Sequence, residues 1–160
     1  MLFLHIFQQE NLIEKTCRAL GFKLLKNYFM RNDISARKDI ILLVDTFYET
    51  IRKDEMLGYI FDDIAKVNWV KHLPVMYDFW ENTLFYTGTY SGNPVLSHTH
   101  LHRLFPITKA HFDHWNLLFG QTIDKLFEGD KAELAKQRAL SISIVLQIKI
   151  AQAPKPEQLL

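Results

Sequence analysis

Apolar residues recur at intervals of three and four over most of the chain, which is the spacing of one face of an α-helix. The first such series follows Ser35, whose hydroxyl we expect to cap the helix, although Lys38 stands where a complete capping box needs Glu or Gln. Gly58 and the segment FDD at 61–63 then interrupt the pattern. The predicted inner face of this helix consists of Ile40, Ile41, Val44, Phe47, Tyr48 and Ile51.

A second helix is predicted by the next apolar series. Pro74 is tolerated only near the first turn of a helix, so we expect either a start near residue 67 to 70 or a distortion there. Asn93 and Pro94 pair a capping residue with a proline at the first helical position, which predicts a short helix that carries His98. The inner face of the second helix is predicted to comprise Trp69, His72, Val75, Met76, Phe79, Trp80 and Thr83.

Two further helices are predicted in the last third of the chain. One runs from about Thr108 to Phe127 and is ended by Gly129. Asp130 and Glu133 form a capping box that opens the final helix, which runs to about residue 150. No segment has the alternation of a strand, so the predicted fold class is all-α. The predicted inner face of the helix that begins near Thr108 comprises Phe112, Trp115, Leu118, Phe119, Thr122 and Ile123.

Composition and charge narrow the classes of function. A chain of 160 residues with 48% hydrophobic side chains has enough material for one buried core, so we expect a single domain. A net charge of +1 without a basic cluster gives no footprint for nucleic acid or an anionic membrane surface, and no stretch is long enough to span a membrane. The single cysteine, Cys17, excludes an internal disulfide, a thiolate zinc cage and covalently attached haem, which favours a reducing, cytoplasmic setting.

Three histidines on alternate positions raise the question of a metal ligand. His98, His100 and His102 could all face one zinc ion only on an extended strand. In the helix predicted here His98 and His102 share a face, while His100 points away. His111 and His114 lie close enough on a helix to share a metal but lack a third ligand. The plainer interpretation makes all of these except His98 surface or half-buried side chains.

An iron porphyrin is a further alternative, with His98 as the ligand of the iron. Such a group needs large apolar side chains around its plane and polar groups on the face opposite the ligand. Tyr48, His72 and Trp115 are hydrogen-bonding side chains, each set within an apolar stripe on a separate predicted helix. Each could equally be a core aromatic or a surface histidine, so composition and spacing leave the alternatives open.

Five segments, in this order, resemble the truncated globins of group III, also called the P group. The resemblance runs from about Asn32 to Lys149 and implies a truncated globin-like helical fold packed around a haem pocket, with haem b (iron protoporphyrin IX) bound without covalent attachment. We expect an N-terminal extension, helical or disordered, over 1–32, a globin-like domain over 33–150 and a flexible tail over 151–160. The segments are DIILLVDTFYETIRKDEMLGYIF, WVKHLPVMYDFW, Y-x-G-N-P with a histidine four residues after the proline, HFDHWNLLF and LFEGDKAELAKQRA.

The resemblance implies a role for each polar residue of the site. His98 is the proximal ligand of the iron, Tyr48 is the distal hydrogen-bond donor, and His72 is the distal gate. The indole N–H of Trp115 faces the distal pocket. His102 lies one helical turn beyond His98 and is the main competitor for the iron; otherwise it is expected, like His100, to face solvent.

The apolar lining is implied in the same way. Phe61 stands at the haem edge, Met76 lies over the haem, and Trp80 forms a pocket wall, whereas Pro74 departs from the family pattern. The resemblance implies reversible binding of oxygen and other diatomic gases, including nitric oxide and carbon monoxide. An alternative is a haem enzyme for nitric oxide dioxygenation or peroxide reduction, which would need an unidentified reductase. A second alternative is a non-haem metal-binding domain or a helical interaction module.

Overall fold

The computed structural model describes residues 31–152. Most of the predicted N-terminal extension and of the C-terminal tail lies outside this range. Within it the chain forms five α-helices, one π-helical turn and no strand, so the predicted all-α class is confirmed. None of these helices is long and apolar enough to cross a membrane. The elements are α2 (Arg37–Lys53), η1 (Ile60–Ile64), α3 (Trp69–Phe85), α4 (Pro94–Leu104), α5 (Lys109–Leu126) and α6 (Asp130–Ala151).

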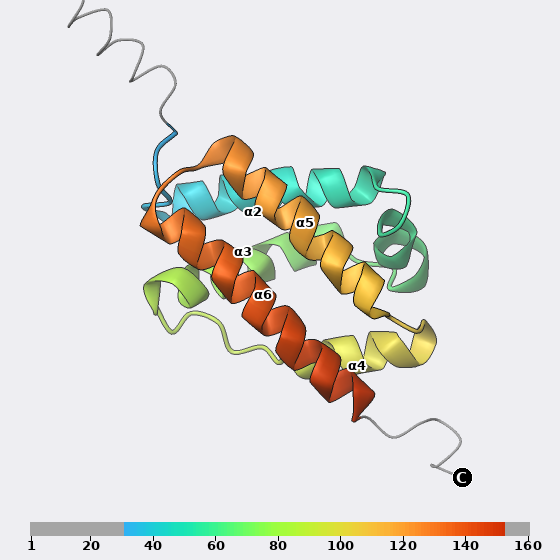
Figure 1. Ribbon diagram of the computed structural model, residues 1–160. Helices are drawn as coiled ribbons and strands as arrows, with labels where there is room; N and C mark the ends of the chain where they lie inside the picture. The colour runs from blue at the N-terminus through green and yellow to red at the C-terminus, as the bar shows by residue number, and fades with distance from the viewer. Residues whose placement is uncertain (1–30, 153–160) are drawn as a thin grey trace, which may run out of the picture. The chain divides into compact units, whose positions relative to one another are not determined.

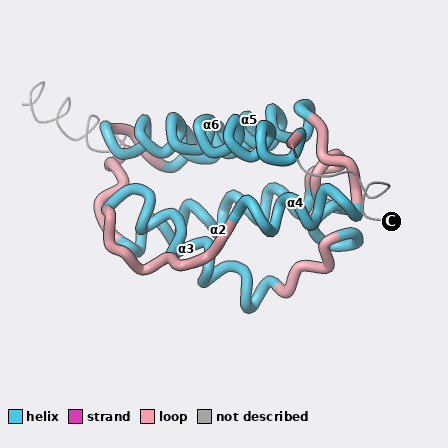
Figure 2. The backbone as a smooth tube through the Cα atoms, turned by 90° about the horizontal axis from the view of Figure 1, so that it is seen from below, coloured by secondary structure: helices cyan, strands magenta, loops and turns pink. Residues whose placement is uncertain are grey.

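The helices of this domain form two layers. Figure 2 shows α5 and α6 together in one layer and α2 and α3 in the other, and Figure 1 shows α5 and α6 crossing over the helices behind them. Helix α2 packs on α3 and α5, while α6 packs on α3, α4 and α5. The core fills the space between the layers, and its largest fully buried side chains include Phe47, Leu84, Phe119 and Ile123.

The start of α2 differs from the prediction in its capping residue. The N-cap is Ala36, so the expected cap through the Ser35 hydroxyl is wrong. The carboxylate of Asp39, in the first turn, instead accepts the backbone N–H groups of Ser35 and Ala36 at 2.9 and 3.0 Å. It also accepts the Ser35 hydroxyl at 2.9 Å. The Asp39 carboxylate therefore lies at the N-terminus of the helix, where the partial positive charge of the helix dipole stabilises it.

The start of α6 is capped by a residue from far away in the sequence. Its N-cap is Gly129 and Asp130 is the first helical residue, so the predicted capping box of Asp130 with Glu133 is wrong. The two carboxylate oxygens of Asp33 accept the N–H groups of Lys131 and Ala132, each at 2.9 Å. A Cβ at Gly129 would lie 2.5 Å from the Asp33 Cγ, so only glycine leaves room for this cap.

The starts of α3 and α4 follow local signals. Asn68 caps α3 by accepting the N–H of Lys71 at 3.2 Å, which confirms the predicted start near residue 67 to 70. Helix α3 continues through Pro74, but the expectation that Val75 faces inward is wrong, because 45% of Val75 is exposed. Asn93 accepts the N–H of Leu96 at 3.0 Å and is followed by proline, as expected for α4.

Candidate functional site

Four aromatic rings from three elements meet beside the C-terminal half of α2. Tyr48 lies on α2, Phe61 on η1, and Trp69 and His72 on the first turn of α3. The centre of the Tyr48 ring lies 5.2 Å from that of His72, 5.5 Å from Trp69 and 5.9 Å from Phe61. We call these four residues the distal cluster. The structure thus brings together three residues to which the family resemblance gives roles at the haem, namely Tyr48, Phe61 and His72.

One nitrogen of the His72 imidazole is buried. Within the described residues its Nε2 atom has no hydrogen-bond partner. Burial, and then the nearby charge of His98, lowers the pKa of His72 below its ordinary value, so the ring is neutral near pH 7. Buried polar atoms are normally paired, so an unpaired nitrogen here indicates a group that awaits a partner.

The hydroxyl of Tyr48 is suited to donate a hydrogen bond. Tyr48 is 6% exposed, and its burial raises the pKa of the phenol well above its ordinary value. The oxygen therefore keeps its proton throughout the physiological range of pH.

Trp115 and Trp80 stack on one central ring. The Trp115 ring lies 5.0 Å from that of Phe119 at an angle of 20°, and the Trp80 ring lies 4.5 Å from it at 23°. Phe47 contacts both Trp115 and Tyr48, at centroid distances of 4.8 and 5.1 Å. Trp80 is buried in the core, whereas Trp115 is half-buried, as is Met76, which packs against the same core.

The imidazole of His98 is held by a hydrogen bond within its own helix, α4. The Nδ1 atom of His98 donates a hydrogen bond to the carbonyl of Pro94, one turn earlier on α4, at 2.7 Å. Burial lowers the pKa of His98, and the bond to Pro94 offsets this only in part. The neutral ring with its proton on Nδ1 has a free lone pair on Nε2, which is the form that binds a metal.

His102 has the opposite arrangement of hydrogen bonds. Its Nδ1 atom accepts the backbone N–H of Ile107 at 3.0 Å, so the proton of the neutral ring sits on Nε2. No lone pair then remains for a metal. His102 is also half-buried, which corrects the expectation that it faces solvent, whereas His100 is exposed as expected. The hydrogen bonds therefore favour His98 over His102 as a ligand.

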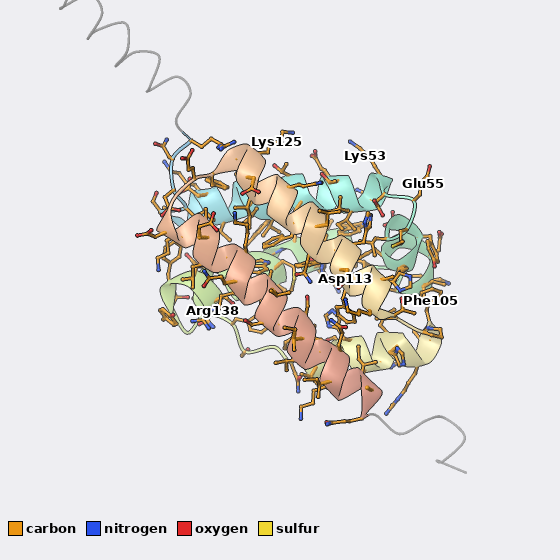
Figure 3. The ribbon with its side chains drawn as sticks, in the orientation of Figure 1. Lys53, Glu55, Phe105, Asp113, Lys125 and Arg138 are labelled. Carbon is orange, nitrogen blue, oxygen red and sulfur yellow. The ribbon has the colours of Figure 1, made fainter. Side chains whose placement is uncertain are left out.

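The two histidines of α5, His111 and His114, form hydrogen bonds that stabilise the fold. His111 accepts the N–H of Thr108 at 3.0 Å and so caps α5, and His114 donates to Asp54 at 2.7 Å. Figure 3 labels the sequence neighbours of this second pair: Lys53 and Glu55 flank Asp54 at the end of α2, and Asp113 precedes His114 on α5. Within residues 31–152 no three His, Cys, Asp or Glu side chains gather into a metal-binding group, so the zinc alternative finds no support there.

Trp69 belongs to the distal cluster, although neither the helical pattern nor the family resemblance predicts a functional role for it. Its ring contacts Tyr48, Phe61 and His72, and its indole N–H is bound by the carboxylate of Asp62 at 2.8 Å. One signal was available, because Trp69 precedes His72 by three residues and so shares its face of the helix.

Comparison with known proteins identifies the family. The profile of the bacterial-like globin family matches residues 31–144, and the chain belongs to this family. The group 3 truncated hemoglobin of Campylobacter jejuni is 28% identical over 117 residues, which cover 71% of this chain and 90% of that protein. The crystal structure of the group III truncated hemoglobin from the same organism has a TM-score of 0.67, with 28% identity, and covers 76% of this chain and 95% of the other. The resemblance to group III truncated globins is therefore confirmed.

Membership in this family makes the chain a haem globin, and the residues of the site fit that group. A neutral imidazole with a free Nε2 lies on α4, and α3 carries a buried imidazole nitrogen that has no partner within residues 31–152. Large aromatic side chains supply the apolar surroundings that a porphyrin plane requires.

Proposed function

We propose that this globin binds haem b through His98 and holds oxygen or another diatomic gas on the opposite side, beside Tyr48, His72 and Trp115. One relationship carries the proposal. His98 keeps its Nε2 lone pair free through the bond to Pro94, and Nε2 of His72 is buried without a hydrogen-bond partner among the described residues. This is the arrangement expected of a proximal ligand and a distal polar group that face a common space.

His98 acts as the single protein ligand of the iron. Its bond to the Pro94 carbonyl fixes the orientation of the ring and increases the electron density on Nε2, as partners of metal-bound histidines generally do. When bound, the haem supplies an iron with a sixth position for a small ligand. The ring of Phe112 lies beside the imidazole, with the ring centres 6.5 Å apart and the planes at 27°.

Tyr48 and Trp115 act as hydrogen-bond donors toward the ligand. A donor aimed at a charged acceptor contributes about 1.5–3 kcal/mol. This energy corresponds to roughly tenfold to a hundredfold slower ligand release for each donor. Phe61, Met76 and Trp80 complete the apolar surroundings. Turnover of nitric oxide or peroxide, with its reductase, stays a prediction from the sequence.

The test is the visible spectrum of the full chain after addition of hemin. We expect a Soret band in the ferric form that shifts on reduction and again on exposure to carbon monoxide. Extraction of all the colour into acidified organic solvent identifies a haem that is not covalently attached. A protein that stays colourless in the presence of hemin overturns the proposal, and colour that cannot be extracted overturns the assignment of haem b.

A further inference from the structure

Two residues from two other elements lie against the indole of Trp69. Its Nε1 donates to Oδ1 of Asp62 at 2.8 Å, and the guanidinium carbon of Arg52 lies 5.2 Å from the centre of the ring. Arg52 and Asp62 also approach each other, with Nε and Oδ2 3.7 Å apart. We call Arg52, Asp62 and Trp69 the indole clamp. It joins the end of α2, the π-helical turn η1 and the start of α3.

Each member of the indole clamp is close in sequence to one ring of the distal cluster. On α2 the arginine lies one helical turn after Tyr48, and in η1 the aspartate directly follows Phe61. On α3 the tryptophan precedes His72 by one turn. A change in the indole clamp therefore moves the backbone segments that carry the distal side chains.

The indole of Trp69 turns one edge to the charged side chains of the indole clamp and another to the rings of the distal cluster. Its N–H is bound by the carboxylate of Asp62, so its polar edge is turned to the charged pair. Its ring lies 5.5 Å from Tyr48, 5.9 Å from His72 and 6.0 Å from Phe61, which gives the distal cluster an apolar wall. Nε2 of His72 has no partner among the described residues, so ring contacts of this kind hold its imidazole.

We propose that the indole clamp positions Tyr48 and His72 around the gas ligand, with Trp69 as a lining residue and Arg52 and Asp62 as positioning residues. This inference rests on the proposed function. A loosened indole clamp gives the His72 ring more freedom, which opens the path to the iron and weakens the hydrogen bonds to the ligand. Both association and release then become faster.

The contacts within the indole clamp are not of equal strength. The side chains of Arg52 and Asp62 are 53% and 38% exposed, so their ion pair is weak. The indole bond has an ionised acceptor and a good distance, which makes it the stronger contact. We therefore expect loss of the carboxylate or of the indole N–H to have more effect than loss of the guanidinium.

The first experiment measures ligand kinetics in the ferrous, haem-loaded full chain. We expect W69F and D62A to speed carbon monoxide association and oxygen release by about threefold to tenfold, the range typical of changes that act through neighbouring residues. R52Q should change both rates less. The matched control is D63A, because Asp63 is the next residue of η1, carries the same charge and is exposed. The infrared stretching band of bound carbon monoxide should shift in W69F and D62A and stay unchanged in D63A.

The second experiment observes the indole N–H of Trp69 directly by NMR in the full chain as purified. The chain has three tryptophans, and W69F identifies which signal belongs to Trp69. We expect its exchange with solvent to be slow in the wild type and in D63A, and fast in D62A. In kinetics the double variant D62A/W69F should match either single variant, because both remove the same contact.

The outcomes separate the two proposals. A wild type that takes up no haem contradicts the proposed function, whereas the indole exchange still reports on the indole clamp. A wild type that binds carbon monoxide, with W69F and D62A at wild-type rates and with an unshifted infrared band, overturns this inference alone. Should D62A fail to fold by circular dichroism, wild-type rates in both W69F and R52Q overturn it.

Discussion

The Nε2 atom of His114 on α5 lies 2.7 Å from Oδ2 of Asp54, the residue that follows α2. The other carboxylate oxygen of Asp54 accepts the N–H groups of Met56 and Leu57 at 3.0 and 2.9 Å. One carboxylate therefore joins α5, which carries Trp115, to the turn that leads into η1. Burial alone would raise the pKa of Asp54, but these hydrogen bonds outweigh it and hold the pKa below 3.8.

The Asp54 contacts predict a defined dependence of stability on pH. Because the pKa is lowered on folding, the ionised carboxylate stabilises the fold above the ordinary value of 3.8, and this is lost as the pH falls through the folded value. We expect Asp54→Asn to reduce the free energy of unfolding by about 1 kcal/mol near neutral pH. The difference should shrink in acid. Urea unfolding near neutral pH and well below pH 3.8, with Asp63→Asn as control, checks this; a difference independent of pH contradicts it.

The hydrogen bonds of His98 and His102 predict opposite results for two alanine variants. His98→Ala should abolish the spectrum of histidine-ligated haem, because it removes the one imidazole of α4 that combines a free Nε2 lone pair with a half-buried position. His102→Ala should keep that spectrum and lose only the contact to Ile107. Visible spectra and haem retention during gel filtration measure both effects. A ligated spectrum that survives in His98→Ala but not in His102→Ala would reverse the assignment.

Tyr48→Phe is predicted to speed oxygen release. The variant keeps the buried ring and its edge contacts but lacks the donor, so we expect dissociation roughly tenfold to a hundredfold faster. Tyr59→Phe is the control, because Tyr59 is 40% exposed and lies outside the distal cluster. Stopped-flow dissociation from the oxygenated protein gives the rates. Equal rates in the wild type and Tyr48→Phe would exclude Tyr48 as a donor.

Gly129→Ala is predicted to destabilise the fold more than Gly88→Ala. At Gly88 a φ of 72° costs an alanine about 1–2 kcal/mol. Gly129, with a φ of 144° and a ψ of −174°, lies in a region that is essentially restricted to glycine. Only at Gly129 would the added Cβ meet a side chain, the carboxylate of Asp33 that caps α6. Thermal and urea unfolding of the two variants compare the costs. Addition of Asp33→Ala should relieve part of the loss in Gly129→Ala and none of that in Gly88→Ala.

The parts of the fold that the sequence predicted are those set by neighbouring residues. Asn68 and the Asn93–Pro94 pair cap their helices within three residues, so the starts of α3 and α4 were accessible from local patterns. The cap of α6 was not, because its acceptor, Asp33, lies almost a hundred residues away in the sequence. The π-helical turn η1 also has no local signature, and only an interruption of the helical pattern was visible there.

In the candidate site, too, local patterns predicted some features, whereas others depend on contacts between distant residues. Helical spacing placed His72 and Trp115 on inner faces, and the family resemblance added their roles. The resemblance also made His98 the ligand of the iron, but helical spacing left His102 on the same face of the helix as a competitor. That choice depends on which atoms face the two Nδ1 positions, a carbonyl in one case and an N–H in the other. Trp69 was placed on the inner face correctly, yet its partner Asp62 lies on a different element, so the indole clamp could be found only in three dimensions.

In the π-helical turn Ile60–Ile64 the backbone hydrogen bonds join residues five apart, rather than four apart as in an α-helix. Deletion of a single residue there would shift the register of Phe61 and Asp62 by one position, which is about 100° of helical rotation. Phe61 would then turn away from Tyr48 and Trp69, and Asp62 would turn away from the indole N–H that it accepts. The length of this short segment is thus a constraint on evolutionary change that is independent of which amino acids fill it, and a one-residue gap in a related sequence would signal a pocket built in another way.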